Sequence, residues 1–137
     1  MLGNDEPKAS LPGEYVVHDQ SAGFLDYTEK YSQTGHVDFV VPALVSKTVM
    51  ARIQRMAIQA FQAIDGAGLS RVDFFLSRDG GKLLVNEINT MPGLTEVSGY
   101  PKMWVASGLT YAAMLDRLIE LALERHREKS LTKTTRN

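Results

Sequence analysis

The sequence predicts an α+β fold in which a mainly antiparallel sheet packs against two long helices. Two segments, 46–65 and 110–126, carry apolar residues at helical spacing. Two alternating segments, 71–76 and 82–89, flank the turn sequence RDGG and read as a hairpin. Because an amphipathic helix and a sheet with one apolar face each need a partner surface, we expect both helices to lie on one face of the sheet.

The composition sets limits on function before any motif is considered. The 137 residues suit one ordinary domain, and 44% hydrophobic with 23% charged residues is typical of a soluble globular protein. Lys plus Arg total 15 against 16 Asp plus Glu, so no basic field favours nucleic acid. We find no membrane span, no secretory leader and no cysteine, which excludes disulfides and thiolate sites. A cytoplasmic protein fits best.

The first third of the chain is predicted to be short strands joined by polar segments. Residues 1–13, rich in proline and glycine, read as an extended lead-in with no core of its own. Three strands follow in the order 14–17, 23–27 and 37–41, and Pro42 ends the last of them. The polar stretch 28–35 between the second and third strands is interpreted as an exposed loop.

Each long helix has a start signal. Ser46 is the predicted N-cap of the first helix, and Gly66 or Gly68 can end it. Thr110 caps the second, whose apolar stripe is Tyr111, Met114, Leu115, Leu118, Ile119 and Ala122. A short helical segment at 103–106 is predicted to end at Gly108. The domain is expected to comprise residues 1–126, with 127–137 as a charged, disordered tail.

The hairpin places unlike side chains on its two faces. Val72, Phe74 and Leu76 form an apolar face that should pack on a helix, and Arg71, Asp73 and Phe75 form the other. On the return strand, the residues predicted to share that second face are Leu83, Val85, Glu87 and Asn89.

Loop length decides the pairing across the hairpin. A three-residue loop, Asp79 to Gly81, pairs Asp73 with Glu87 and Arg71 with Asn89, whereas a two-residue loop puts Asp73 beside Asn86. Two carboxylates and an amide on one face suit a hard cation such as Mg²⁺, and an arginine adds a fork for an anionic oxygen. On spacing alone, a solvated face with cross-strand charge pairs is the better interpretation.

The sequence after the hairpin favours the cation site. It reads NEINTMPGLT over Asn86–Thr95 and SGYPKMW over Ser98–Trp104. With LGNDEPKASLPGE, FLDYTEKY, GLSRVDFFL and SGLTYAAMLDRLIELALERH, this resembles the C-terminal catalytic half of D-alanine–D-alanine ligases in the ATP-grasp superfamily. The resemblance implies an ATP-grasp C-terminal subdomain that helps join two D-alanines through an acyl-phosphate for peptidoglycan synthesis.

The resemblance also assigns residues. It places the ligands of two Mg²⁺ or Mn²⁺ ions at Asp73, Glu87 and Asn89. It places groups that act on the substrates at Arg71, Gly93, Ser98 and Tyr31. It places groups that contact ATP at Lys30, Phe24, Phe75, Asn86 and Glu87. Without the resemblance, Lys30 would be an ordinary loop lysine, Tyr31 would pack on the sheet, Gly93 would serve the turn and Ser98 would cap a helix.

Within these groups the implied roles differ. Arg71 would hold the acyl-phosphate, the Gly93 N–H would donate to the oxyanion, and Ser98 would contact the carboxylate of the second substrate. Lys30 and Tyr31 would belong to a mobile loop, 28–35, that closes over the phosphates.

Several features depart from the family pattern. The hairpin has one residue more than usual, expected to be taken up in the turn, and Gly99 stands where a larger apolar residue is common. The N-terminal and central domains are missing, and Met1–Asn4 looks like a start placed inside a parent sequence. We therefore expect the chain to be inactive alone, and to form a homodimer through the exposed face bearing Phe75, Leu83 and Val85.

Two alternative functions remain open. A related ligase could use D-lactate or D-serine as its second substrate. The chain could instead be a stand-alone, non-catalytic interaction module.

Overall fold

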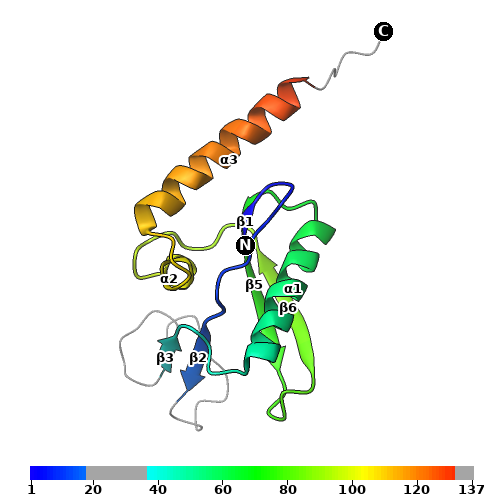
Figure 1. Cartoon of the computed structure of the whole chain (residues 1–137), viewed down its shortest axis with the longest axis vertical. Coiled ribbons are helices and arrows are strands. Elements are labelled where there is room, and N and C mark those ends of the chain that lie inside the picture. Colours follow the sequence, from blue (N-terminus) through cyan, green and yellow to red (C-terminus); the bar gives the residue numbers. More distant parts are fainter. Residues whose placement is uncertain (18–36, 132–137) are drawn as a thin grey trace.

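The computed structural model describes residues 1–17 and 37–131. The elements, shown in Figure 1, are β1 (Leu2–Gly3), β2 (Glu14–Val17), β3 (Val37–Val40), α1 (Lys47–Ala63), β4 (Gly68–Leu69), β5 (Arg71–Leu76), β6 (Leu83–Asn89), α2 (Gly99–Ala106) and α3 (Tyr111–Leu131). The predicted strand at 23–27 and loop at 28–35 lie outside the described residues, as do Phe24, Lys30 and Tyr31.

The mixed architecture was predicted, but its layout differs from one sheet under two long helices. In the part of the chain that the structure describes, the strands form three antiparallel pairs, β1–β4, β2–β3 and β5–β6, and there are three helices. The strands predicted at 14–17 and 37–41 are present as the β2–β3 pair. Helix α2 begins four residues earlier than the predicted segment at 103–106, and Gly108, with φ of 91°, follows its end.

Helix α1 covers the apolar face of the β5–β6 hairpin, as the sequence predicts. Ser46 is its N-cap, because the Ser46 Oγ accepts a hydrogen bond from the Val49 N–H at 3.3 Å. The buried side chains of α1, Ala57 and Phe61, form one core cluster with Met1, and Val72 and Phe74 of β5 pack against it. Because α1 covers the face with Val72 and Phe74, the opposite face of the hairpin, with Arg71 and Asp73, is the one that a ligand can reach.

The lead-in does have a place in the core, contrary to the prediction. Leu2 pairs with Leu69 and Gly3 with Gly68, and the Met1 amino group donates to the Ser70 carbonyl at 2.7 Å. Met1 and Leu2 are 5% and 7% exposed. Burial lowers the pKa of the Met1 amino group from 8.0 to about 5. A two-residue strand with a distant partner leaves no local pattern, which is why the sequence does not reveal it.

Helix α3 packs mainly on α2, β1 and β4, so the two long helices do not share one sheet face. Its core cluster comprises Leu2, Tyr100, Trp104, Met114 and Leu121. Thr110 caps α3 as predicted, since its Oγ1 accepts from the Ala113 N–H at 3.2 Å. The predicted stripe is partly wrong: Ile119 is 61% exposed, and Leu121 is buried instead. The helix continues past His126 to Leu131.

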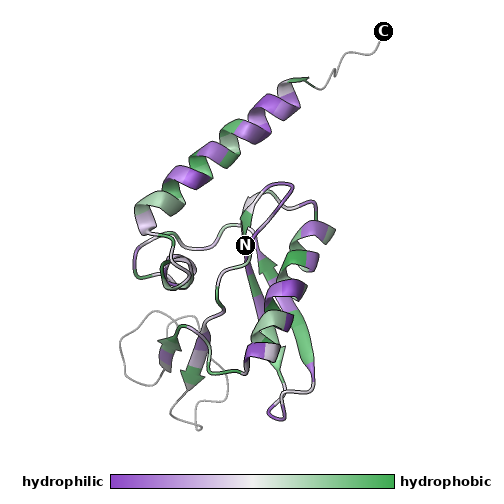
Figure 2. Ribbon diagram, in the orientation of Figure 1, coloured by the Kyte–Doolittle hydropathy of each residue, from purple (hydrophilic) through white to green (hydrophobic). Residues whose placement is uncertain are grey.

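Figure 2 shows hydrophilic and hydrophobic residues alternating along α3, as a helix covered on one side requires. No helix among the described residues is long and apolar enough to cross a membrane.

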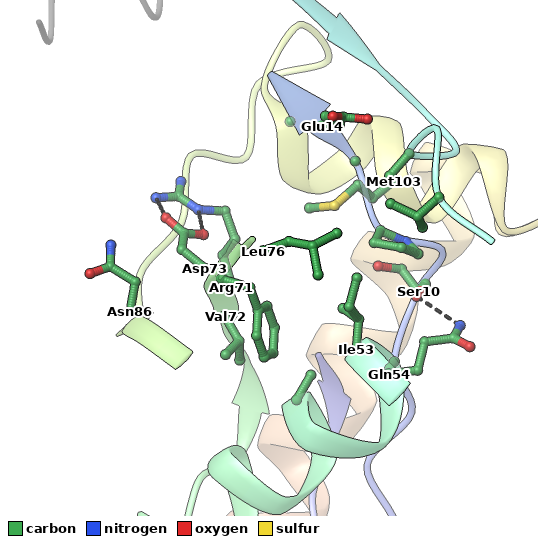
Figure 3. Close-up of a pocket in the computed structure, with 18 of the residues that line it drawn as sticks. Ser10, Glu14, Ile53, Gln54, Arg71, Val72, Asp73, Leu76, Asn86 and Met103 are labelled. Atoms are coloured by element: carbon green, nitrogen blue, oxygen red, sulfur yellow. Dashed lines mark hydrogen bonds and ion pairs between the residues drawn. The ribbon is translucent and has the colours of Figure 1, made fainter. Parts of the chain in front are cut away.

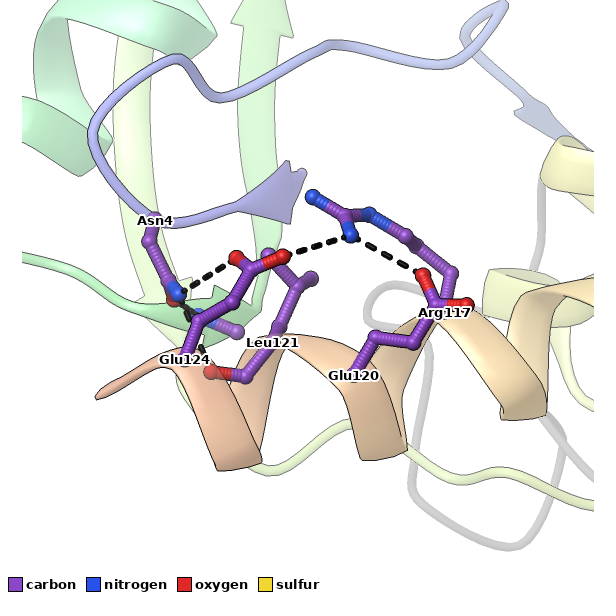
Figure 4. A network of polar contacts seen from close by, with 6 residues as sticks. Asn4, Arg117, Glu120, Leu121 and Glu124 are labelled. Atoms are coloured by element: carbon purple, nitrogen blue, oxygen red, sulfur yellow. Dashed lines mark hydrogen bonds and ion pairs between the residues drawn. The ribbon is translucent and has the colours of Figure 1, made fainter. Parts of the chain in front are cut away.

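A polar clasp, drawn in Figure 4, joins α3 to the β1–β4 pair. The Asn4 Nδ2 donates to the Leu121 carbonyl at 3.0 Å, and the Asn4 Oδ1 accepts from the Gly68 N–H at 3.2 Å. Glu124 lies 3.5 Å from the Asn4 amide and also pairs with Arg117. One asparagine therefore links three elements that are far apart in sequence.

Candidate functional site

The site face of the hairpin is set by a change of register within β6. Arg71 pairs with Asn89 and Asp73 with Glu87, as the three-residue loop predicts. Nearer the turn, Phe74 pairs with Val85 and Leu76 with Leu83, as the two-residue loop predicts. The extra residue is therefore accommodated by a bulge at Asn86 within the strand and not in the turn alone.

The bulge also corrects the predicted face of two residues. Beyond it, Leu83 turns to the helix side and is 4% exposed, and Val85 lies across from Phe74. The exposed apolar pair on the site side is Phe75 and Leu84, at 60% and 59% exposure. A two-residue side-chain period makes every residue past a one-residue insertion change sides.

Arg71 brings the two carboxylates of the site together. Its Nε donates to the Asp73 Oδ1 at 2.7 Å and its Nη2 to the Asp73 Oδ2 at 2.9 Å. The same Nη2 lies 3.6 Å from the Glu87 Oε1. Asp73 is largely covered, with 29% of its side chain exposed, whereas Glu87 is 56% exposed. One positive charge, that of the Arg71 guanidinium, therefore lies close to both carboxylates.

Asn89 completes the predicted ligand set at the end of β6. Its Oδ1 accepts a hydrogen bond from the Met91 N–H at 3.0 Å, which orients the amide at the start of the following loop. Among residues 1–17 and 37–131, no three Asp, Glu, His or Cys side chains gather at one point. Two carboxylates and one amide oxygen still fit a hard divalent cation, provided that water and phosphate oxygens fill the rest of its shell.

The loop between β6 and α2 brings Gly93 and Ser98 into contact. The Ser98 Oγ lies 2.7 Å from the Thr95 Oγ1, and the Ser98 N–H donates to the Thr95 carbonyl at 2.8 Å. A Cβ on residue 93 would lie 2.8 Å from the Ser98 Oγ, so any larger residue there would displace this hydroxyl. Ser98 is the N-cap residue of α2, yet its side chain makes no cap hydrogen bond.

Thr95 and Tyr111 hold this loop, and neither was predicted to do so. The Tyr111 hydroxyl donates to the Leu94 carbonyl at 2.6 Å and ties the loop to the start of α3. The Thr-x-x-Ser spacing could have indicated the Thr95 contact, because hydroxyl residues three apart often share a turn. Nothing in the sequence links Tyr111 to Leu94.

A cleft of about 450 Å³ runs along β5 and reaches from Arg71 and Asp73 to the start of α2. Figure 3 shows it between β5, α1 and the segment that leads into β2, with the Arg71–Asp73 pair at one rim. Asn86 lies beyond the Arg71–Asp73 pair, on the side of the pair that faces away from α1. Gly99 and Met103 of α2 line the same cleft. Arg71, Asp73 and the start of α2 therefore face one space.

Comparison with known proteins places this arrangement in a family. Residues 1–120 match the family model described as "D-ala D-ala ligase C-terminus". The chain is 48% identical over 136 residues to a D-alanine–D-alanine ligase from Heliobacterium modesticaldum, covering 99% of the chain and 36% of that relative. A Bacillus velezensis D-alanine–D-alanine ligase is 49% identical over 98% of the chain and 37% of the relative. The chain spans about a third of the length of the curated relatives that it matches.

Solved structures agree with the sequence comparison. The D-alanine–D-alanine ligase from Coxiella burnetii superposes with a TM-score of 0.76 at 44% identity, over 94% of this chain and 32% of that one. The D-Ala:D-Ser ligase VanG from Enterococcus faecalis gives 0.73 at 39% identity, over 88% and 34%. The Bacillus anthracis D-alanine–D-alanine ligase complexed with ATP gives 0.57 at 30% identity, over 61% and 29%.

Proposed function

The chain belongs to the D-alanine–D-alanine ligase family, and from this membership we propose that it is the catalytic C-terminal part of an ATP-dependent, cytoplasmic ligase. In the proposed reaction, the terminal phosphate of ATP moves to the carboxylate of one D-alanine, which gives an acyl-phosphate and ADP. The amine of a second D-alanine then attacks the acyl carbon, and phosphate leaves. The dipeptide product would serve peptidoglycan synthesis.

One observation carries the proposal: Asp73 and Glu87 lie directly across from each other, with the Arg71 guanidinium reaching both. Asp73, Glu87 and Asn89 would hold two Mg²⁺ or Mn²⁺ ions together with phosphate oxygens. Such ions, when bound, screen the charge on the transferred phosphoryl group. The planar guanidinium of Arg71 matches the oxygens of an acyl-phosphate and would hold them in place.

The loop after β6 would handle the acyl transfer. The Gly93 N–H is proposed to donate to the oxygen that gains charge as the amine attacks, because a fixed donor stabilises that charge without reorganising. Ser98 is proposed to bind the carboxylate of the second substrate. The contact between Gly93 and the Ser98 hydroxyl supports a shared role, since it keeps both groups in one small volume.

ATP is the proposed phosphate donor. The similarity to a Bacillus anthracis ligase solved with ATP supports this assignment. Phe75, exposed on the site side of β5, together with Phe24 and Asn86, is proposed to line the nucleotide site. Lys30 and Tyr31 are proposed to close over the phosphates from the loop at 28–35.

The remaining two thirds of the relatives' length is proposed to supply the N-terminal and central domains, with the rest of the ATP site and the first D-alanine site. The isolated chain is then inactive, because positioning of reactants supplies much of the rate and half of the positioning groups are missing. A homodimer, formed through the exposed Phe75 and Leu84, is part of the same proposal.

D-Serine or D-lactate as the second substrate is the alternative within the family. The similarity to a D-Ala:D-Ser ligase favours keeping D-serine as a candidate. A non-catalytic interaction module is the alternative outside it. Titration of the 137-residue chain with ATP and Mg²⁺ separates a ligase of this family from the interaction module, since tight nucleotide binding would support a functional ligase module.

A hybrid ligase tests the proposal. It consists of the part of the Bacillus velezensis relative that precedes the matched region, followed by the whole 137-residue chain. We expect it to form D-alanyl-D-alanine and ADP from ATP, Mg²⁺ and D-alanine, and expect Glu87→Gln to abolish product. Glu120→Gln, an exposed glutamate of α3 that pairs with Arg117, is the matched control. A folded hybrid without product, or full activity in Glu87→Gln, would refute the proposal.

A further inference from the structure

The ring of Phe39 is held between two glycines from different parts of the chain. Phe39 lies on β3, Gly13 precedes β2, and Gly99 is the first residue of α2. A Cβ atom on residue 13 would overlap the Phe39 Cζ, and one on residue 99 would lie 3.1 Å from the same atom. Carbon atoms in contact lie about 3.5–4.0 Å apart. The tip of the ring therefore fills space that a side chain at either position would need.

This packing lies beside the proposed second-substrate site. Gly99 directly follows Ser98, and both Phe39 and Gly99 line the cleft that Arg71 and Asp73 also line. On the β2 side, the ring of Tyr15 packs on that of Phe39, with centroids 4.8 Å apart. The aromatic ring is thus supported on one side and presents its tip to the start of α2.

We infer that Phe39 forms the apolar wall beside Ser98 and so helps to select the second substrate, in place of the side chain that residue 99 lacks. This inference rests on the proposed function, because Ser98 is there assigned to the carboxylate of that substrate. The wall then comes from β3 and not from α2. A large residue at position 99 would crowd the ring at position 39, because a Cβ there would already lie 3.1 Å from the Phe39 Cζ.

The chemistry of the wall predicts its preference. A phenyl ring offers no hydrogen-bond partner, so the part of the Phe39 ring that lines the cleft accepts the methyl group of D-alanine and leaves the hydroxyl of D-serine unpaired. Apolar pockets discriminate only modestly against an added hydroxyl, by about 100-fold at most. Phe39 is therefore a specificity determinant and not a group that acts on the reacting atoms.

The packing is tested first, by thermal unfolding of the 137-residue chain. We expect Gly99→Leu to lower the melting temperature, and expect much less loss when Phe39→Ala is already present. Gly13→Ala should show the same dependence on Phe39 from the other side of the ring. If Gly99→Leu prevents folding, Gly99→Ala takes its place. Equal losses with and without Phe39 would overturn the inference, because residues in contact are not additive.

Selectivity is tested in the hybrid ligase, as the ratio of kcat/KM for D-alanine to that for D-serine as second substrate. We expect Phe39→Ala to lower this ratio by about tenfold, mainly through the KM of the second substrate. Adding Gly99→Leu to Phe39→Ala should restore part of it. Val105→Ala, on the exposed side of α2, should leave the ratio unchanged.

The outcomes separate the two levels of proposal. An active hybrid whose ratio does not change in Phe39→Ala overturns the selectivity inference and leaves the proposed function intact. A folded wild-type hybrid that makes no dipeptide overturns the proposed function, and with it the inference.

Discussion

Arg71 and Asp73 lie two residues apart on β5 and are joined by two hydrogen bonds, of 2.7 and 2.9 Å. Side chains at this spacing share one face of a strand, so the pair is built into the alternation of the sequence. A guanidinium that already neutralises a carboxylate lowers the attraction of that site for another cation. The arginine and a metal ion therefore compete for Asp73 and Glu87.

This competition predicts that Mg²⁺ alone binds the chain weakly. Millimolar Mg²⁺ without nucleotide should leave the melting temperature of the wild-type chain nearly unchanged. In Arg71→Ala the two carboxylates lose their shared partner, and Mg²⁺ should then stabilise the chain by about 1.4 kcal/mol at ten times its dissociation constant.

Arg117→Ala is the matched control for this experiment, because Arg117 also pairs with two carboxylates, those of Glu120 and Glu124. It should show no response to Mg²⁺, since the Asn4 amide beside Glu124 turns its Nδ2 toward that carboxylate and its Oδ1 toward the Gly68 N–H. A large stabilisation of the wild-type chain by Mg²⁺ alone, lost in Glu87→Gln, would mean that the metal site is preformed despite Arg71.

The clasp at Asn4 predicts a second effect, on stability alone. Asn4→Ala removes the bonds to the Leu121 carbonyl and the Gly68 N–H, and leaves partly buried groups without these partners. We expect the free energy of unfolding, measured by urea denaturation, to fall by about 1–3 kcal/mol. Gln62→Ala, an exposed amide on α1, should change it little. Equal effects would show that the clasp contributes nothing specific.

Buried Met1 predicts a pH dependence in a protein made with Met1 as its free N-terminus. Burial lowers the pKa of its amino group to about 5, from 8.0. Between these values the unfolded chain holds a proton that the folded chain does not, so stability should rise as pH increases from about 5 to 8. At about 1.4 kcal/mol per pKa unit, the full effect is at most about 4 kcal/mol.

Acetylation of Met1 removes the titrating charge and keeps an N–H donor. The acetylated chain should lose this part of the pH dependence, whereas the part that arises from other groups should persist in both forms. Identical curves for the free and acetylated chains would contradict the burial of a neutral amine.

Local signals predicted the elements that frame the site. Helix α1 follows from the spacing of its apolar residues and from Ser46, and the β5–β6 hairpin follows from alternation around RDGG. The face that carries Arg71, Asp73 and Glu87 could be predicted for the same reason. These features depend on residues close together in sequence, where periodicity and capping act.

The features that the sequence did not predict depend on contacts between segments that are distant in sequence. The bulge at Asn86 combines both registers that the turn allows, and only burial of Leu83 against the helix side shows which strand absorbs the extra residue. The β1–β4 pair requires Met1 and Leu2 to find a partner far along the chain. The contact of the Phe39 ring with Gly99 joins β3 to α2, and no local pattern in either segment indicates it. The roles of Lys30, Tyr31 and Phe24 stay predictions, since they lie outside the described residues.

The corrected apolar face predicts self-association of the chain. Phe75 and Leu84 pair across the hairpin at 60% and 59% exposure, beside the charged site. Exposed apolar patches tend to find partners, and a two-fold dimer is the commonest closed arrangement. Sedimentation velocity should show a monomer–dimer equilibrium that shifts with concentration.

Phe75→Glu should leave only monomer, because a carboxylate would have to be buried without a partner. Ile119→Glu, at an equally exposed apolar position on α3, should not alter the equilibrium. A chain that stays monomeric at high concentration, or that loses its dimer through Ile119→Glu and not Phe75→Glu, would show that this hairpin face is not the interface.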